Sequence, residues 1–555
     1  MKNQKVELAI TGMTCDHCAT GIENRLLKTP GVRAAQASFA DGRCKVEYDP
    51  EVTSEQAMAD AVQHNTAYRV TGLKAADPVD QKADGTAPYD LLIIGGGSAA
   101  FSAAITAEGL GLRTLMVNGG LDFGGTCVNV GCVPSKNLIR AAETVHRASH
   151  SHFPGIKPKG ADIDFAAVIR GKKELVATLQ QEKYMDVVSD FQGLTLVKGT
   201  ATLVSDRTIE VDRKQRYKGL KILIATGATT HVPAIEGLDK IAYLTTESLF
   251  DLEEKPAGLT ILGAGYIGSE VAMAYVRLGV RVRMIEFTDR VMRTQTTDIS
   301  AAIMEAMTDE GIEVLPNMRV QRVEMHGTNT VLHCVDAEGS AHQLVEPGKV
   351  LVATGIKPNT AGLGLEQVGV QLDRTGHVQV DAGMATNIPG IYAVGDVANT
   401  PPFVYTAAYE GRIAVQNAFT GQHTEADYTA MPWVIFTDPQ VAGVGLDEAQ
   451  AEAAGLPFEV SKLPMTAVPR ALAAQDTRGF IKLFRHTGTD HLLGARVVAP
   501  EGGELIQLLS MAMTHGITVA QLAQSMYPYL TLSESIKLAA ISFGKDVSKL
   551  SCCAS

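Results

Sequence analysis

The sequence contains the same glycine-rich turn twice, each time between an apolar run and a helical segment. The two runs are LLIIGGGSAA, with Gly95, Gly97 and Ala100, and LTILGAGYIGSE, with Gly263, Gly265 and Gly268. Glycines at this spacing allow a tight strand-to-helix turn and let a pyrophosphate approach the helix N-terminus. One such string alone is also compatible with a plain turn, but two copies favour nucleotide binding. We therefore predict an α/β fold with two Rossmann-like dinucleotide-binding domains.

The composition narrows the class of protein further. Of the 555 residues, 45% are hydrophobic and 20% are charged, which is typical of a globular chain with several cores. The net charge of −12 and the aromatic content of 5% argue against a nucleic-acid partner. No apolar run reaches the roughly 18 to 20 residues of a membrane helix, and the first residues do not resemble a secretory signal. We expect a cytoplasmic protein with no insertion into a membrane.

Both ends of the chain differ from this α/β region. Residues 1–70 follow the order strand, helix, two strands, helix and strand, which predicts a small ferredoxin-like β-α-β-β-α-β domain. Residues 71–88 are rich in Ala, Asp, Gly and Pro and are predicted to be a flexible linker. Residues 425–555 alternate strands such as FIKLF with helices such as ELIQLLSMAMTHG and lack a glycine fingerprint. This last part is predicted to be an α+β interface domain.

Each glycine fingerprint is followed, at the same distance along the chain, by a residue placed to contact an adenosine ribose. These residues are Asn118 and Glu286. Glu286 can accept hydrogen bonds from both ribose hydroxyls and would repel a 2′-phosphate, which favours NADH over NADPH. Arg290 and Arg293 follow closely and are able to bind such a phosphate, so the sequence leaves the choice open. Asn118 lacks the charge, so a weaker ribose contact is expected there.

Six of the eight cysteines fall into three close pairs: Cys15 and Cys18, Cys127 and Cys132, and Cys552 and Cys553. The central pair lies in GGTCVNVGCVPSK, at the start of a predicted helix and just before Lys136. A helix N-terminus and a nearby cation both stabilise a thiolate. Two buried structural cysteines are the alternative, but the spacing and the glycines favour a redox pair. Cys44 and Cys334 are predicted to be small buried residues.

The central stretch resembles the active site of the flavin-dependent pyridine nucleotide-disulfide oxidoreductases, and the resemblance extends over roughly residues 88–550. Ala225-Thr226-Gly227, Ala353-Thr354-Gly355 and Ile391-Tyr-Ala-Val-Gly395-Asp396 also match. The resemblance implies FAD on the first fingerprint and NADPH or NADH on the second. It further implies an FAD-binding domain over 89–235 and 354–424, an NAD(P)-binding domain over 236–353, and a homodimer built on residues 425–555.

The same resemblance assigns residues to the two cofactors. The FAD-binding residues are expected to be Gly95, Gly97, Ala100, Asn118, Thr126, Lys136, Thr226, Gly227, Asp396 and Val404. The NAD(P)-binding residues are expected to be Gly263, Gly265, Tyr266, Gly268, Glu286 and Gly355, and Tyr266 matches a tyrosine that covers the nicotinamide pocket in some relatives. Cys132 would be the thiolate against the flavin, and Cys127 the outer thiol that exchanges with substrate.

The C-terminal region departs from the disulfide reductases of this family. Those enzymes carry a His-Pro-Thr stretch whose histidine is a general base, whereas this chain has Tyr527-Pro-Tyr529-Leu-Thr531. A phenol with an ordinary pKa near 10 is a poor base at neutral pH but can donate a hydrogen bond beside a thiolate-metal complex. Reduction of an organic disulfide is therefore disfavoured.

The two outer cysteine pairs indicate a soft metal. Gly12-Met13-Thr14-Cys15-Asp-His-Cys18 resembles the loop of heavy-metal-associated domains, and Cys552-Cys553 can act as a two-thiol clamp. His17 is predicted to be a solvated residue and not a third ligand. Half a zinc site and a thioredoxin-like pair remain alternatives for the first loop, although neither suits the predicted domain.

Taken together, these features resemble the members of the family that reduce mercury. They imply two-electron reduction of Hg(II), bound as a thiol complex, to Hg(0), with Cys15, Cys18, Cys127, Cys132, Cys552 and Cys553 as metal ligands. Tyr184 and Tyr529 match two active-site tyrosines, although Tyr184 is also compatible with a plain core position. The tail pair would serve the other subunit, and a membrane transporter is a candidate donor of the metal. The alternatives are a disulfide reductase similar to lipoamide dehydrogenase and a metal chaperone fused to a flavoprotein.

Overall fold

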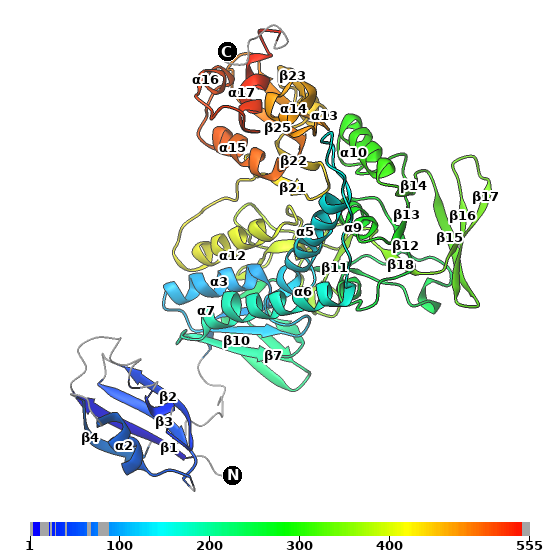
Figure 1. The fold of residues 1–555 in the computed structure, drawn as a ribbon. Helices are drawn as coiled ribbons and strands as arrows, with labels where there is room; N and C mark the ends of the chain where they lie inside the picture. The colour runs from blue at the N-terminus through cyan, green and yellow to red at the C-terminus, as the bar shows by residue number, and fades with distance from the viewer. Residues whose placement is uncertain are drawn as a thin grey trace. The chain divides into compact units, whose positions relative to one another are not determined.

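The computed structural model describes residues 4–11, 22, 25–27, 29–38, 42–50, 52–63, 68–75 and 88–546. The chain forms two compact units, Met1–Thr86 and Ala87–Ser555 (Figure 1). The cysteines of the two predicted terminal metal sites, Cys15, Cys18, Cys552 and Cys553, lie outside the described residues, as does His17.

The N-terminal unit has the predicted ferredoxin-like order. Strands β1 (Gln4–Thr11), β2 (Val32–Ser38), β3 (Arg43–Tyr48) and β4 (Arg69–Ala75) form an antiparallel sheet in the order β2-β3-β1-β4, with helix α2 (Glu55–Gln63) on the chain between β3 and β4. Alternate residues of β3 are buried, as expected for a sheet with one face on a core. Cys44 is one of them and is fully buried, as predicted. β4 runs to Ala75, beyond the expected end of this domain at residue 70.

The first nucleotide-binding sheet begins the larger unit. Strands β7 (Leu194–Lys198), β6 (Thr114–Asn118), β5 (Tyr89–Ile94), β10 (Gln215–Ile224) and β20 (Ile391–Ala393) lie side by side and parallel. β8 (Ala201–Ser205) and β9 (Thr208–Val211) extend it as an antiparallel meander on β10. The apolar LLII run lies in β5 because a central parallel strand is covered on both faces.

Two helices that are far apart in the sequence pack together on this sheet. α3 (Ser98–Gly109) follows the first glycine turn, and α12 (Val404–Phe419) lies beside it (Figure 1). Small residues permit the close approach: a Cβ on Gly411 would lie 2.4 Å from the carbonyl oxygen of Ala99. Ser102 also donates a hydrogen bond of 2.6 Å to the carbonyl of Ala408. Residues that precede and residues that follow the second nucleotide-binding region in the sequence thus form one domain.

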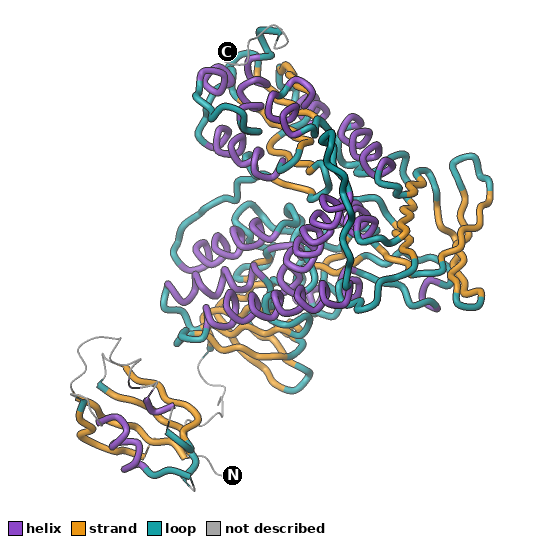
Figure 2. The backbone as a smooth tube through the Cα atoms, viewed as in Figure 1, coloured by secondary structure: helices purple, strands orange, loops and turns teal. Residues whose placement is uncertain are grey.

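The second nucleotide-binding sheet repeats the design of the first. β14 (Glu313–Leu315), β13 (Arg281–Ile285), β12 (Gly258–Leu262) and β18 (Lys349–Val352) are parallel, and α9 (Tyr266–Arg277) follows the second glycine turn. An antiparallel sheet of β15 (Arg319–His326), β16 (Asn329–Val335) and β17 (Ala341–Glu346) stands at its edge (Figure 2). Cys334 is buried in this sheet, as predicted. The duplicated α/β architecture is confirmed.

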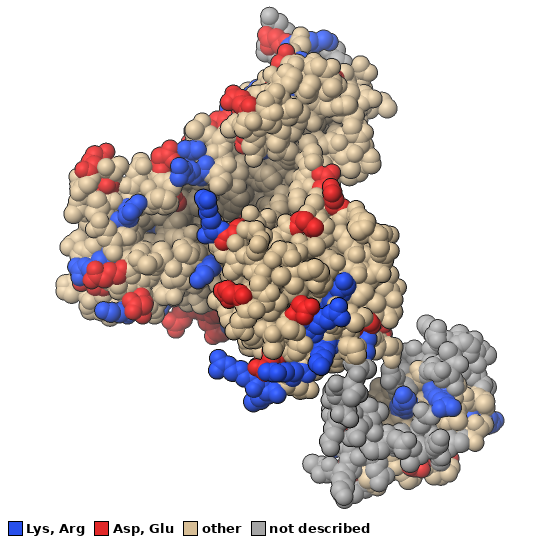
Figure 3. All heavy atoms as spheres, turned by 180° about the vertical axis from the view of Figure 1, so that it is seen from behind, with Lys and Arg blue, Asp and Glu red and all other residues tan. Residues whose placement is uncertain are grey.

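The C-terminal part is the expected α+β domain. Its antiparallel sheet has the order β21 (Trp433–Ile435), β22 (Gln440–Gly445), β25 (Leu492–Ala499), β24 (Phe480–His486) and β23 (Phe458–Pro464). Helices α15 (Gly502–Thr514), α16 (Val519–Gln524) and α17 (Glu534–Ile541) complete it. Figure 3 shows the larger unit hollowed below this domain, with acidic and basic side chains interspersed over much of that face.

The remaining elements connect these sheets. They are α4 (Gly125–Asn129), α5 (Cys132–Ser149), α6 (Phe165–Gln180), η1 (Gln181–Met185), α7 (Asp186–Val188), β11 (Ala228–Thr230), η2 (Leu238–Lys240), α8 (Thr246–Leu249), α10 (Thr297–Asp309), β19 (Ile356–Pro358), α11 (Leu365–Val368), η3 (Gly395–Val397), α13 (Glu448–Ala453), η4 (Met465–Ala467) and α14 (Pro469–Ala474). Within the described ranges, no helix has the length and apolar character needed to cross a membrane.

Candidate active site

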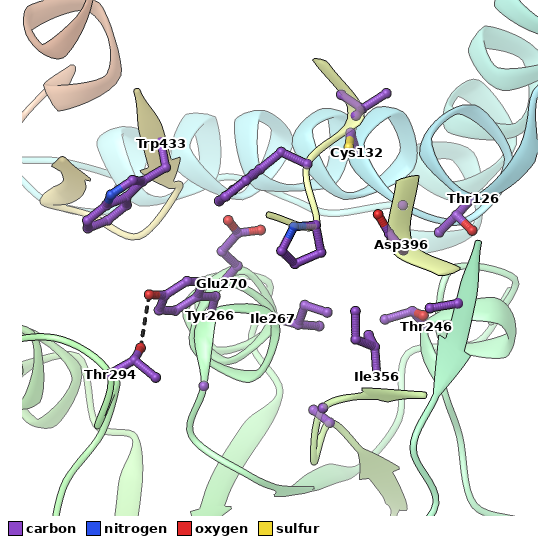
Figure 4. Close-up of a pocket in the computed structure, with 18 of the residues that line it drawn as sticks. Thr126, Cys132, Thr246, Tyr266, Ile267, Glu270, Thr294, Ile356, Asp396 and Trp433 are labelled. Carbon is purple, nitrogen blue, oxygen red and sulfur yellow. Dashed lines mark hydrogen bonds between the residues drawn. The ribbon is translucent and has the colours of Figure 1, made fainter. Parts of the chain in front are cut away.

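One continuous cavity of about 1920 Å³ lies in the larger unit, between the two nucleotide-binding sheets and the C-terminal domain. Its wall includes both cysteines of the central pair and residues of both glycine turns. In Figure 4, Thr126, Cys132 and Asp396 lie along one side, and Tyr266 and Thr294 lie toward the other. The cavity therefore brings together the redox pair and the two predicted nucleotide sites.

A short helix and the start of a long one hold the cysteine pair. Cys127 lies in α4 and Cys132 is the first residue of α5, so its thiol is at a helix N-terminus. Gly131 separates the two helices, and a Cβ there would lie 2.8 Å from the carbonyl oxygen of Thr126, which explains the glycine. Both cysteines are free thiols, and each alters the acidity of the other.

The two thiols have opposite acidities. The hydrogen bond from Cys127 lowers the pKa of Cys132 to about 7, and the charge of Lys136 lowers it as well. The same hydrogen bond and burial raise the pKa of Cys127. At neutral pH, Cys132 is thus poised as the thiolate and Cys127 remains a protonated thiol.

Lys136 is held beside the pair by a residue that the sequence analysis missed. Its Nζ lies 2.7 Å from Oε2 of Glu270 on α9 and 4.6 Å from the ring centroid of Phe436. Glu270 also accepts a hydrogen bond of 2.9 Å from the backbone N–H of Phe436. The nearby Glu270 charge raises the pKa of Cys132 and so opposes Lys136. Its position two residues after Gly268 was the only available signal in the sequence.

The two predicted tyrosines are placed differently. Tyr184 lies in the π-helix η1, its hydroxyl is 3.3 Å from Oγ of Ser98, and its ring packs edge-on against Phe101 at 5.0 Å. Burial raises its pKa, and the charges of the cysteine pair contribute. Tyr529 lies between α16 and α17 and is 55% exposed. Neither tyrosine is among the described residues that line the cavity.

The first glycine turn makes a cradle that only small residues permit. Gly95 has φ +128°, and a Cβ there would lie 2.1 Å from the carbonyl oxygen of Ala225. A Cβ on Gly125 would lie 2.5 Å from Cα of Gly97. Ala100 is fully buried behind the turn. This close backbone approach beside an open cavity fits a bound dinucleotide.

Further predicted FAD contacts are divided between the cavity wall and its support. Gly97, Thr126, Lys136, Gly227, Asp396 and Val404 line the cavity. Thr226 is behind the wall and donates a hydrogen bond of 2.8 Å to the carbonyl of Asn359. Asn118 is not among the lining residues, and its Nδ2 donates to the carbonyl of Leu121 at 2.7 Å.

The Gly395-Asp396 turn supplies an acid to the cavity. Burial raises the pKa of the Asp396 carboxyl, which suits an acid that is matched by hydroxyl donors of a ligand. A second acid that the sequence analysis missed holds this turn: buried Glu410 accepts 2.6 Å from the Gly395 N–H and 2.7 Å from the Tyr428 hydroxyl. Glu410 lies on α12, and nothing local in the sequence indicates its partner. The donor set and the cradle together fit FAD.

The second glycine turn is equally close-packed. Gly263 has φ +103° and would place a Cβ 2.5 Å from the carbonyl oxygen of Ala353, and a Cβ on Gly268 would lie 2.3 Å from the carbonyl oxygen of Gly263. Gly265 and Gly355 line the cavity, whereas Gly268 lies behind it. This arrangement fits a nicotinamide nucleotide on the helix N-terminus of α9.

Tyr266 is packed at the mouth of this second site. Its ring is stacked on that of Trp433 at 6.2 Å and 9°, which joins α9 to the C-terminal domain. Its hydroxyl lies 2.9 Å from Oγ1 of Thr294, as the dashed line in Figure 4 marks, and accepts a hydrogen bond of 2.5 Å from Gln295. All four side chains line the cavity.

Comparison with known proteins identifies the fold family. The sequence profile described as "Pyridine nucleotide-disulphide oxidoreductase" matches residues 89–411. The chain belongs to this family. Two further profiles match the ends, the dimerisation domain of the same family over residues 431–540 and the heavy-metal-associated domain over residues 7–69.

Curated relatives within the family extend over the whole chain. A mercuric reductase of Staphylococcus aureus is 39% identical over 100% of both chains, and that of Bacillus cereus is 39% identical over 99% of this chain and 87% of its own. A mercuric reductase of Streptomyces lividans is 43% identical over 84% of this chain and 98% of its own. Among solved structures, the Escherichia coli HOCl-induced flavoprotein disulfide reductase RclA in its Cu(II) complex has a TM-score of 0.74. It is 29% identical over 83% of this chain and 100% of its own.

Like other members of the family, the protein requires FAD and a pyridine nucleotide, and the cavity described above can hold both. Metal ligation is a separate matter. Within the described ranges, no cluster of three or more Cys, His, Asp or Glu side chains is arranged to hold a metal ion. In this part of the chain, the cysteine pair is thus the candidate site for a two-coordinate soft metal.

Proposed function

We propose that this protein reduces Hg(II) to Hg(0) with electrons from NAD(P)H. The observation that carries the proposal is the Cys127–Cys132 pair, in which one thiol is acidic and the other is not, in the wall of a cavity that also holds both nucleotide sites. The mercuric reductases that resemble the chain over its full length support mercury as the substrate. The balanced reaction consumes Hg(II) and NAD(P)H and yields Hg(0), NAD(P)⁺ and a proton.

The cysteine pair receives the metal by ligand exchange. Hg(II) strongly prefers thiolates, so it arrives as a thiol complex and each step replaces one thiolate by another. Cys127, the outer thiol, exchanges first and passes its proton to the thiolate that it displaces, and Cys132, already poised as a thiolate, becomes the second ligand. Cys15 with Cys18, and Cys552 with Cys553, are proposed to deliver the metal to this pair. FAD, when bound, supplies the two electrons that it has received from NAD(P)H.

Surrounding residues are proposed to control charge at the pair. Lys136 stabilises the Cys132 thiolate, and Glu270 fixes Lys136. Tyr184 donates a hydrogen bond toward the metal complex from within one chain. Tyr529 is proposed to do so from the partner subunit of a homodimer, because it is exposed in the domain whose profile is named for dimerisation. The cytoplasm, with a membrane transporter as metal donor, is the proposed setting.

The test is oxidation of NADH and NADPH by the FAD-loaded protein, with Hg(II) in excess thiol and volatile mercury trapped. We expect nucleotide oxidation that depends on Hg(II), with mercury leaving the solution. Cys127→Ser and Cys132→Ser should abolish it, whereas Cys334→Ala, which alters a buried cysteine outside the cavity, should not.

A disulfide substrate separates this proposal from its main rival. A disulfide reductase, which is how RclA is described, would need the central pair but would be indifferent to loss of Cys552 and Cys553. Turnover with an organic disulfide and none with Hg(II) would overturn the proposal. Loss of Hg(II) turnover in the Cys552→Ser and Cys553→Ser double variant, with no loss of FAD, would support it.

A further inference from the structure

Glu286 forms the wall of the second nucleotide site where an adenosine ribose is expected. Its carboxylate is buried, lines the cavity, and already accepts three hydrogen bonds. Oε2 accepts from the N–H of Ala264 at 2.7 Å, and Oε1 accepts from the N–H and the hydroxyl of Thr288, both at 2.8 Å. A carboxylate offers about four acceptor positions, so one remains on Oε2. Glu286 can therefore accept a hydrogen bond from only one ribose hydroxyl. The sequence had suggested that it accepts from both.

The hydrogen bonds also fix where this negative charge lies. Ala264 belongs to the glycine turn that faces the pyrophosphate, and Thr288 belongs to the loop after β13. The carboxylate cannot swing away from the ribose without breaking bonds on both sides. A 2′-phosphate would bring further negative charge against this fixed carboxylate in the cavity wall, and the repulsion would weaken binding of the phosphorylated nucleotide.

Neither of the two arginines able to offset this repulsion is among the described residues of the cavity wall. The Nη1 of Arg290 lies 3.2 and 2.9 Å from the two carboxylate oxygens of Asp289, and its Nη2 donates to the carbonyl of Arg293 at 3.2 Å. Arg293 is exposed. The charge of Arg290 is thus partly compensated by the carboxylate of Asp289.

The cation that does line this corner, Arg319, lies over an aromatic ring. Its guanidinium carbon is 5.9 Å from the ring centroid of Phe287, and both side chains line the cavity. Phe287 is 63% exposed, which is unusual for a phenylalanine that follows a buried strand. A flat ring beside a guanidinium suits the stacking of an adenine base, which NADH and NADPH share.

We infer that the ribose corner formed by Glu286, Phe287 and Arg319 selects a free 2′-hydroxyl, so that NADH, and not NADPH, is the electron donor. The inference deepens the proposed function, since it names the reductant of the same site. It concerns nucleotide binding, however, and is measurable without any mercury present.

The experiment compares NAD⁺ and NADP⁺ binding to the oxidised, FAD-loaded full chain. Calorimetry gives both dissociation constants, and the fluorescence of Trp433, the only tryptophan, gives a second readout because this ring is stacked on Tyr266 in the cavity wall. We expect NAD⁺ to bind at least about tenfold more tightly than NADP⁺. Equal or tighter binding of NADP⁺ would overturn the inference, whatever the outcome with mercury.

Three variants test the assignment of residues. Glu286→Gln keeps an acceptor oxygen but removes the charge. It should reduce the ratio of the NADP⁺ dissociation constant to the NAD⁺ dissociation constant at least several-fold, mainly through tighter NADP⁺ binding. Arg290→Ala should leave the ratio unchanged, and Arg319→Ala should weaken both nucleotides to the same extent. A selective loss of NADP⁺ affinity in either arginine variant would show that a phosphate site exists after all.

Salt dependence of the unmodified protein covers the case in which Glu286→Gln fails to fold. Added salt screens repulsion, so the preference for NAD⁺ should shrink as ionic strength rises. If an arginine instead bound the 2′-phosphate, salt would weaken NADP⁺ selectively and the preference would grow. The two outcomes have opposite signs, and the second would contradict the inference.

Discussion

At the scale of single residues, the acidity of Cys132 is the property on which the proposed chemistry depends. Its pKa near 7 results from the hydrogen bond of Cys127, with a further contribution from Lys136, which is itself held by Glu270. Burial works in the opposite direction. The thiolate is therefore maintained by neighbouring groups and not by exposure to water.

Removal of the cation should shift this balance. In Lys136→Met, alkylation of the reduced, FAD-loaded protein by iodoacetamide should depend on pH with a midpoint about one pH unit above that of the unmodified protein, because an opposite charge no longer stabilises the thiolate. The unmodified protein should show a midpoint near pH 7 and react faster above it. Lys198→Met, at a side chain that is 73% exposed, is the matched control. An unchanged midpoint in Lys136→Met would show that the charge of Lys136 does not lower the pKa of Cys132.

Some residue positions could be predicted from sequence and others could not. The cysteine pair, Lys136 and the glycines were recognisable because close backbone approach and local spacing restrict which residues can occupy these positions, whereas Asp396 was expected from the family resemblance alone. Glu270 and Glu410 were missed because their partners are remote in the sequence. Asn118 was expected at the cavity, yet its side chain turns back to cap its own loop.

At the scale of elements, buried ion pairs join α9 and α10 to the C-terminal domain. The guanidinium of Arg277 on α9 pairs with Glu310, which follows α10. The Nη2 of Arg277 also lies 2.9 Å from Oδ2 of Asp438. Asp438 is shared with Arg478, whose Nη2 lies 2.7 Å from Oδ1. The side chain of Arg277 is only 4% exposed, so these charges compensate one another away from water.

Breaking this network from one side should be costly. Arg277→Met leaves two carboxylates without their shared cation, and we expect the free energy of unfolding to fall by about 3 to 5 kcal/mol. Arg216→Met removes an ion pair with Glu210 in which the arginine is 63% exposed, and should cost less than about 1 kcal/mol. Urea unfolding followed by Trp433 fluorescence measures both. Similar losses in the two variants would show that the buried network does not tie the domains together.

The elements were the most predictable level of the structure. β5 and β12 are apolar runs before glycine turns, and their parallel sheets follow from that pattern. The end of β4 was misplaced because Gly72 and Lys74 resemble a linker in composition, whereas the backbone of this segment pairs with β1. The pairing of a strand is only weakly specified by a sequence that contains glycine and polar residues.

At the scale of the whole molecule, the division into two compact units allows the activity of the larger unit to be measured alone. A chain that begins at Ala87 retains every described residue of the cavity. We expect it to keep most of its Hg(II)-dependent NADH oxidation at saturating thiol-bound mercury, because the N-terminal unit only delivers metal in the proposed mechanism.

A point variant controls for the truncation itself. Cys15→Ser with Cys18→Ser in the full chain should behave like the shortened protein, with its effect confined to low mercury concentrations. If the shortened protein keeps FAD but loses activity at every mercury concentration, the N-terminal unit takes part in reduction and the metal-chaperone alternative gains support.

The position of β20 in the sequence has a consequence for the order in which the two nucleotide-binding domains fold during synthesis. This strand, Ile391–Ala393, completes the first parallel sheet beside β10, although β5 of that sheet begins at Tyr89. The second sheet has all its strands by Val352. On the ribosome, where the chain emerges from its N-terminus, the second nucleotide domain can close before the first. The edge of β10 that pairs with β20 therefore stays unpaired while the second nucleotide-binding domain, whose strands begin later in the sequence, is already able to fold.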